Sequence, residues 1–325
     1  MPGSWPRWRP DHKLAEVSTA AAPEPPSGPG RTWRSLYQQA AARLGDHQVA
    51  RWFVEEASGG RWPMVLDEEA TAGGAERLGR MVERRCSGEP VQYVLGHWAF
   101  RGLDLLVDRR ALIPRPETEV VVEVALGELD RLGSEGALAV DLGTGSGAIA
   151  LSLAAERPGV QVWATDRSEG ALAVAAANLA GGGARVAGRV SLARGDWWEA
   201  LPEDLAGRVT LAVANPPYIA EAELAGLPEE VVAWEPREAL VAGPTGLEAL
   251  EQVLGGAARW LAPRSALVAE IAPHQPGAAQ ALACRAGFDE AFVRPDLTGR
   301  DRVLVARRSP GQPERPGAPP AVPAR

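Results

Sequence analysis

The chain has 325 residues, of which 46% are hydrophobic, and this length allows two domains with a sizeable core. No apolar run approaches the roughly 20 residues of a membrane-spanning helix, and the N-terminus lacks the apolar segment of a secretory signal. The net charge of −8 disfavours nonspecific binding of nucleic acid, because such binding needs a basic face. We therefore expect a cytoplasmic protein that binds neither membranes nor nucleic acid directly.

The four histidines and two cysteines show no spacing that is typical of a metal site. Cys86 and Cys284 lie far apart in the chain and form no CxxC pair, and the histidines form no HExxH pattern. We expect no bound metal, and we expect both cysteines to be reduced residues of the core.

Proline-rich stretches lie at both ends of the sequence. Residues 1–31 contain seven prolines and three glycines, and residues 309–325 contain six prolines. Because neither stretch shows apolar periodicity, both are predicted to be disordered tails.

The first folded region is predicted to be a small helical domain over residues 32–97. Its apolar residues recur with the spacing of one helix face, first in a run from Trp33 to Leu44 and then around residues 49–53 and 78–82. Gly88 and Pro90 end the third helix. The segment "WAFRGLDLLVD" then alternates in polarity, which predicts a hairpin linker over residues 98–114.

Residues 115–308 alternate between strands and helices. The predicted strands are "ALAVDLG", "VQVWATD", "RVSLARGD", "VTLAVAN" and "SALVAEI", followed by two strands near the end that a glycine-containing loop joins. Such repeated units favour an α/β fold, a Rossmann-like parallel sheet with helices on both faces. Ligands of these sheets bind beyond the carboxyl ends of the strands.

A glycine-rich loop follows the first of these strands. It consists of Gly143, Thr144, Gly145, Ser146 and Gly147, in which the glycines permit a tight turn and close approach of a ligand to the backbone. Asp166 ends the second strand, where its carboxylate can accept both hydroxyls of a ribose. The glycine-rich loop together with Asp166 predicts an adenosine-bearing cofactor. These residues alone do not decide between a nicotinamide cofactor and S-adenosylmethionine.

Asp196 and Trp197 follow the third strand and are predicted to lie beside the same pocket. The carboxylate can accept from an adenine amino group, and the indole can pack on the ring. A surface turn is the alternative for this pair. Trp198 is expected to point elsewhere.

The fourth strand ends in Asn215, Pro216, Pro217 and Tyr218. The Asn215 side-chain oxygen and the Pro216 carbonyl can each accept one N–H of a planar NH₂ group, and the prolines hold the backbone rigid. Two such bonds would aim a weakly nucleophilic nitrogen at a methyl donor. We expect Asn215 to border the cofactor as well, and Tyr218 to pack on the planar substrate.

These motifs in this order resemble a class I methyltransferase that uses S-adenosylmethionine. The NPPY tetrapeptide is shared by enzymes that methylate DNA adenine and protein glutamine, so it leaves the substrate open. The segments "GEPVQYVLGHWAF", "LIPRPETEV", "EPREAL" and "EIAPHQ" resemble the HemK/PrmC family. That family methylates the glutamine amide in the Gly-Gly-Gln loop of class 1 peptide chain release factors, and its helical N-terminal domain helps to dock them.

The resemblance covers roughly residues 32–307 and implies a role for each motif. The glycine loop, Asp166, Asp196 and Trp197 correspond to cofactor contacts, and residues 215–218 correspond to the glutamine-binding segment. Four further residues of family motifs are interpreted as scaffold of the pocket wall: Arg115, Glu117, Glu235 and Pro236. Ala272 stands where the family usually has glycine, which a turn with negative φ tolerates.

Three other functions were weighed against release-factor methylation. Methylation of an exocyclic amine on a DNA or RNA base would need a flipped base and a basic track, and the acidic charge disfavours it. A non-catalytic binding module is disfavoured by the intact glycine loop and tetrapeptide. A hydride-transferring oxidoreductase would have no use for the tetrapeptide.

Overall fold

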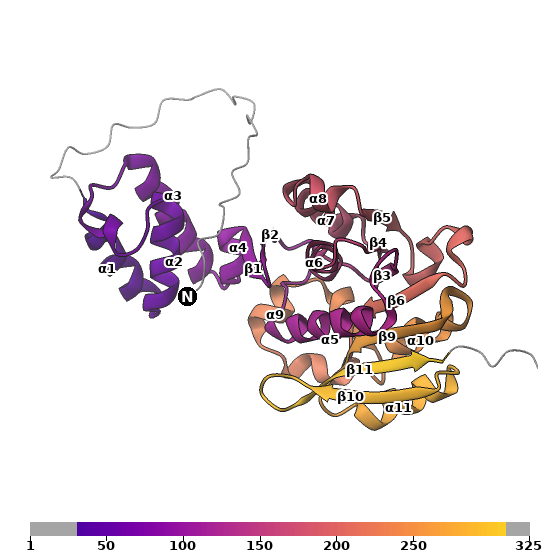
Figure 1. Cartoon of the computed structure of the whole chain (residues 1–325). Helices are drawn as coiled ribbons and strands as arrows, with labels where there is room; N and C mark the ends of the chain where they lie inside the picture. Colours follow the sequence, from indigo (N-terminus) through magenta and orange to yellow (C-terminus); the bar gives the residue numbers. More distant parts are fainter. Residues whose placement is uncertain (1–30, 310–325) are drawn as a thin grey trace, which may run out of the picture. The chain divides into compact units, whose positions relative to one another are not determined.

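The computed structural model describes residues 31–309 (Figure 1). The predicted tails, residues 1–31 and 309–325, therefore lie outside the described residues apart from Arg31 and Ser309. The chain divides between Trp98 and Ala99 into two compact units, each of which is described here by itself.

The first unit is helical, as the apolar spacing predicts. Its helices are α1 (Trp33–Leu44), α2 (His47–Ser58), α3 (Ala72–Cys86) and the short α4 (Val91–Leu95), with a 3₁₀ turn over Met64–Asp67. The side chains of Thr32, Asp46 and Thr71 cap the first three helices by accepting backbone N–H groups. Their buried faces form one core, in which Phe53 and Val54 are fully buried. The sequence analysis did not predict α4.

The second unit is built on a seven-stranded sheet, which confirms the predicted fold class. The strand order is β10-β11-β9-β6-β3-β4-β5, and the strands are β3 (Leu138–Leu142), β4 (Gln161–Asp166), β5 (Val190–Arg194), β6 (Val209–Ala214), β9 (Leu261–Glu270), β10 (Glu290–Pro295) and β11 (Asp301–Arg308). The five strands from β5 to β9 run parallel, whereas β11 and β10 pair antiparallel at one edge. β9 begins before the predicted strand, which started at Ser265.

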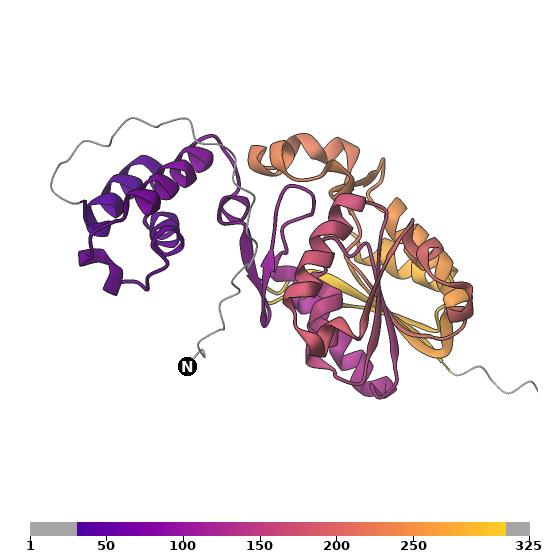
Figure 2. The same cartoon turned by 90° about the horizontal axis from the view of Figure 1, so that it is seen from above.

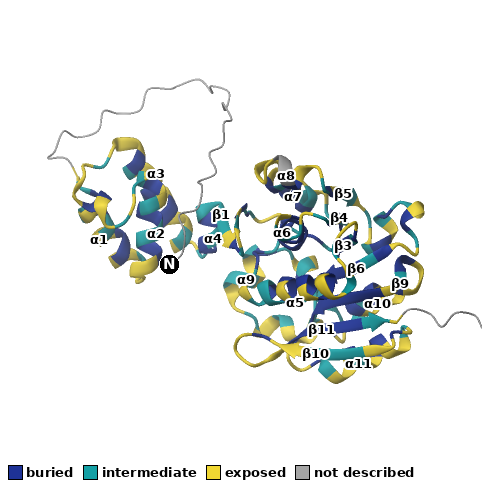
Figure 3. Ribbon diagram, viewed as in Figure 1, coloured by how far each residue is buried: buried dark blue, intermediate teal, exposed yellow. Residues whose placement is uncertain are grey.

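Helices cover both faces of this sheet (Figure 2). The helices of this unit are α5 (Pro116–Leu132), α6 (Ala148–Glu156), α7 (Glu169–Gly181), α8 (Ala184–Ala187), α9 (Glu229–Trp234), α10 (Glu248–Trp260) and α11 (Pro276–Arg285). Among them, α9 has no buried residue and does not contribute to the layers on the sheet. Along β6, Leu211 and Val213 pack with α5 and α6, whereas Ala212 and Ala214 pack with α10 and α11. This alternation follows from the two-residue period of a strand. The buried residues consequently fill the layers on both sides of the sheet (Figure 3).

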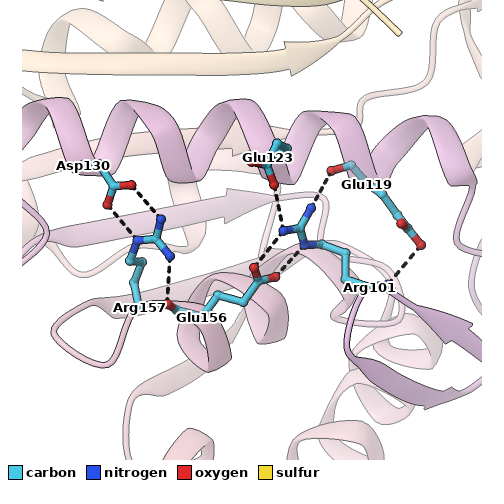
Figure 4. A network of polar contacts seen from close by, with 6 residues as sticks. All are labelled: Arg101, Glu119, Glu123, Asp130, Glu156 and Arg157. Carbon is cyan, nitrogen blue, oxygen red and sulfur yellow. Dashed lines mark hydrogen bonds and ion pairs between the residues drawn. The ribbon is translucent and has the colours of Figure 1, made fainter. Parts of the chain in front are cut away.

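A charged network fixes the turn between β1 (His97–Phe100) and β2 (Leu103–Leu106). Arg101 adopts a positive φ of 48° in this turn, and its guanidinium donates to Glu156 of α6 and Glu123 of α5 (Figure 4). Its backbone N–H donates to Glu119 at 3.0 Å. Hydrogen bonds to Glu156 and Glu123 raise the pKa of the Arg101 guanidinium. The network therefore holds the turn between β1 and β2. The segment after β2 leads to the pocket described below.

Two expectations about single residues have different outcomes. Cys86 and Cys284 are unpaired, but both are exposed, so the prediction that they belong to the core is wrong. They occupy outward-facing positions of α3 and α11, which the cysteine spacing could not reveal.

Within residues 31–309 no helix combines the length and the apolar character that crossing a membrane would need.

Candidate active site

A pocket opens at the carboxyl ends of β3, β4, β5 and β6, as expected for a sheet of this topology. The glycine loop between β3 and α6 forms its floor, with Gly143, Gly145 and Ser146 among the lining residues. Gly143 and Gly145 have φ angles of 76° and 57°, which favour glycine. A Cβ atom at Gly143 would lie 3.1 Å from the ring of Trp197, so the close packing of these two residues also requires glycine.

Asp141 holds the glycine loop from beneath. Its Oδ2 accepts the Thr144 hydroxyl at 2.6 Å and the Ala150 N–H at 3.0 Å. The side chain is fully buried, and burial raises its pKa to about 7. Sequence analysis gave Asp141 no role and placed Thr144 among the cofactor contacts; the structure directs the Thr144 hydroxyl to this carboxyl, although Thr144 also lines the pocket.

Asp166 lies at the end of β4 and lines the pocket beside the loop. Its Oδ2 accepts the Gly145 N–H at 2.9 Å, and its Oδ1 accepts the Ser168 N–H at 2.8 Å. Each oxygen keeps a further lone pair for a ligand. Burial raises the pKa of this carboxyl.

Asp196 and Trp197 also line the pocket, from the turn that follows β5. Trp197 adopts a positive φ of 46°, and its indole N–H donates to Gln252 of α10 at 2.8 Å. Trp198 turns away into the core, where it stacks on Trp260. Trp198 therefore points away from the pocket, as expected.

The tetrapeptide after β6 contributes Asn215 and Pro217 to the pocket lining. Because β6 pairs with β3, this segment lies next to the glycine loop. Pro216 is buried and Tyr218 is half-buried, and neither side chain lines this pocket. The Tyr218 hydroxyl instead donates to Glu270 Oε1 at 3.2 Å, and burial raises the tyrosine pKa.

The pocket wall contains the segments that sequence analysis interpreted as scaffold. Arg115 forms an ion pair with the buried Glu235, which also accepts the Ile113 N–H at 3.2 Å. Arg115 and Pro236 line the pocket, whereas Glu117 lies 3.9 Å from Arg300 and is not among the lining residues. Ala272 has no positive φ, and its N–H donates to Gln275 at 3.0 Å, so the turn accommodates alanine as expected.

Sequence reasoning missed several residues that shape the site. Thr118 receives a hydrogen bond from Asn215 at 3.0 Å, and Gln275 donates to the Tyr218 carbonyl at 3.1 Å. Gln252, Glu238 and Thr118 line the pocket. The segment "LIPRPETEV" was interpreted only as a family motif. The signal that could have indicated Thr118 is a threonine in the first turn of a helix next to the predicted pocket.

Comparisons with known proteins agree with this arrangement. Residues 124–237 match the model of the methyltransferase small domain, and residues 35–96 match that of the PrmC N-terminal domain. The chain is 44% identical over 245 residues to a release factor glutamine methyltransferase of Cereibacter sphaeroides, covering 75% of this chain and 82% of the relative. A protein of the same name from Moorella thermoacetica is 45% identical over 244 residues, covering 75% and 83%.

A solved structure supports the fold alone. The hMettl16 catalytic domain, determined in complex with MAT2A 3′UTR hairpin 6, aligns with a TM-score of 0.50 at 16% identity. The alignment covers 73% of this chain and 81% of that one.

Proposed function

Because the chain belongs to the release factor glutamine methyltransferase family, we propose that it methylates class 1 peptide chain release factors. The methyl group passes from S-adenosylmethionine to the side-chain amide nitrogen, N5, of the glutamine in the Gly-Gly-Gln motif, which modulates translation termination. The observation that carries the proposal is the position of Asn215, which lines one pocket together with Asp166 and the glycine loop.

The pocket suits S-adenosylmethionine. Asp166 offers two carboxylate oxygens to a ribose diol. The loop positions with positive φ are glycines, which have no side chains, so a ligand can approach the backbone there. Trp197 offers an indole face to an adenine, with Asp196 next to it for the amino group. The cofactor, when bound, supplies an electrophilic methyl group on a positively charged sulfur.

Asn215 and Pro216 are proposed to hold the substrate amide. The Asn215 side-chain oxygen accepts one N–H of the glutamine NH₂ group, and the Pro216 carbonyl accepts the other. These bonds aim the nitrogen and increase its electron density, and oriented acceptors of this kind act most strongly away from water. Pro217 lines the pocket beside them, and the Tyr218 hydroxyl holds the segment in place through its hydrogen bond to Glu270.

The two units are proposed to divide the work. The helical domain over residues 32–97 docks the release factor, residues 98–114 form the linker, and residues 115–308 form the methyltransferase domain. Because translation takes place in the cytoplasm, we propose that the protein is cytoplasmic. A protein substrate also agrees with the net charge of −8, since no nucleic acid has to be bound directly.

Transfer of a labelled methyl group tests the proposal. The protein is incubated with labelled S-adenosylmethionine and either a class 1 release factor, the same factor with its Gly-Gly-Gln glutamine changed to alanine, or duplex DNA. We expect label in the intact release factor only. Asn215→Ala should abolish multiple turnover and leave only a residual transfer that single-turnover measurement with excess enzyme detects, while it keeps cofactor affinity. Label in DNA, or equal label in both forms of the factor, would overturn the proposed substrate.

A further inference from the structure

Asn215, Thr118 and Glu270 form a hydrogen-bonded chain of three buried or half-buried polar side chains. The Thr118 hydroxyl donates to Glu270 Oε2 at 2.7 Å, and the Asn215 Nδ2 group donates to Thr118 Oγ1 at 3.0 Å. Thr118 is 4% exposed and Glu270 is 1% exposed. The chain joins α5, β9 and the segment after β6, which are far apart in the sequence.

The chemistry of the hydroxyl group gives this chain a direction. A threonine hydroxyl has one hydrogen, and a carboxylate can only accept. Once the hydrogen is directed to Glu270, the Thr118 oxygen must act as an acceptor toward Asn215. Only the NH₂ end of the Asn215 amide can meet it, so the amide oxygen is left on the other side of the group.

The two ends of an asparagine amide have nearly the same shape, so packing alone does not distinguish them. In the substrate site the difference is decisive. An amide oxygen attracts the NH₂ group of a glutamine, whereas an amide NH₂ would place donor against donor. Within residues 31–309 the hydrogen bond of the Asn215 side chain is the one from its Nδ2 group to Thr118, so Oδ1 is left as an acceptor for a ligand.

Glu270 is well placed to keep the direction fixed. It ends β9, a central strand of the sheet, and its second oxygen accepts the Tyr218 hydroxyl at 3.2 Å. The same carboxylate therefore holds both polar side chains of the tetrapeptide, Tyr218 directly and Asn215 through Thr118. Glu270 is buried and does not line the pocket, so it contributes to the site through these hydrogen bonds.

We propose that Thr118, held by Glu270, is a positioning residue that turns the Asn215 amide so that its oxygen faces the substrate amide. This inference rests on the proposed function. It predicts that removal of the hydroxyl lowers turnover while the binding of cofactor and release factor is preserved.

Three substitutions test the inference. Thr118→Val removes the hydroxyl at nearly constant volume, and Thr118→Ser keeps it. Thr210→Val makes the same chemical change in β6, at the end of the strand that is remote from Asn215. We expect Thr118→Val to lower kcat by about 10- to 100-fold, with KM for the release factor and calorimetric affinity for S-adenosylmethionine within about twofold of wild type. Thr118→Ser should recover most of the turnover, and Thr210→Val should resemble wild type.

A second background shows whether Thr118 acts through Asn215. In Asn215→Ala protein, measured by single turnover with excess enzyme, Thr118→Val should cost nothing further, because the group that it positions is gone. Thr118→Ala replaces the valine variant, with the same expectations, if the valine variant does not remain folded by circular dichroism.

The outcomes separate this inference from the function on which it rests. Wild-type protein that leaves the release factor unmodified would overturn both. An active wild type would overturn the inference alone if Thr118→Val has normal kcat, if Thr118→Ser is impaired as much as Thr118→Val, or if the valine costs the same factor in both backgrounds.

Discussion

Asp166 joins the glycine loop to the end of β4. One of its oxygens accepts the Gly145 N–H and the other accepts the Ser168 N–H, so the carboxylate is aimed before any ligand arrives. A side chain that is already held loses little entropy when it binds a ribose. Recognition of the cofactor should therefore depend strongly on this residue.

We predict that Asp166→Ala weakens the affinity for S-adenosylmethionine by about 100-fold or more, because two hydrogen bonds to a charged group are lost and each contributes about 1.5–3 kcal/mol. Isothermal calorimetry measures the effect. Glu169→Ala is the matched control, since that exposed carboxylate pairs with Arg194 on the surface. Equal affinities of the two variants would remove the ribose assignment.

Asp141 gives a prediction about pH. Burial raises its pKa to about 7, whereas an aspartate in an unfolded chain titrates near about 3.9. Between these values the folded protein retains a proton that the unfolded chain has lost. The stability associated with this residue is therefore full below about pH 4 and is lost as the pH rises through about 7.

Asp141→Asn cannot lose a proton in this range. We expect its free energy of unfolding to increase relative to wild type between about pH 4 and pH 7, by at most about 1.4 kcal/mol per pH unit, and to level off above. Urea unfolding of both proteins at several pH values measures the difference. Parallel profiles would mean that Asp141 does not titrate there.

Helix α10 shows how one element supports the site. It carries Gln252, which holds the Trp197 indole, and it packs against Trp198 on the next position of the same turn. Gly256 allows that contact, because a Cβ atom there would overlap the Trp198 ring. The adjacent Gly255 faces open space.

We predict that Gly256→Ala lowers the free energy of unfolding by about 1–3 kcal/mol, because an overpacked site must shift. Gly255→Ala should be neutral or stabilising by up to about 1 kcal/mol, since alanine favours a helix more than glycine does. Chemical denaturation of both variants provides the comparison. A stable Gly256→Ala protein would show that Trp198 is free to move.

At the scale of the whole molecule, the sequence predicted what local pattern determines. Apolar spacing located the principal helices and strands, which depend on residues close together in the sequence. Residues 143–146 of the glycine loop meet Asp166, Asp196 and Trp197 at one pocket because parallel strands end at the same edge, whereas Gly147 lies at the start of α6 and does not line it.

Contacts between distant segments could not be predicted in the same way. Thr118 and Glu270 are 152 positions apart, and nothing in either local pattern indicates that they share a hydrogen bond. The Tyr218 hydroxyl donates to the same distant glutamate, a contact that no local pattern indicates, and the packing of its ring on the substrate stays a prediction. The exposure of Cys86 and Cys284 likewise depends on which faces of α3 and α11 are covered.

The site of methylation in the release factor tests the central claim most directly. The protein, S-adenosylmethionine and a class 1 release factor are incubated, and the tryptic peptide with the Gly-Gly-Gln motif is sequenced by mass spectrometry. We expect one added methyl group on the glutamine side chain of that peptide. An unmodified peptide, found together with methylated adenine in added DNA, would contradict it.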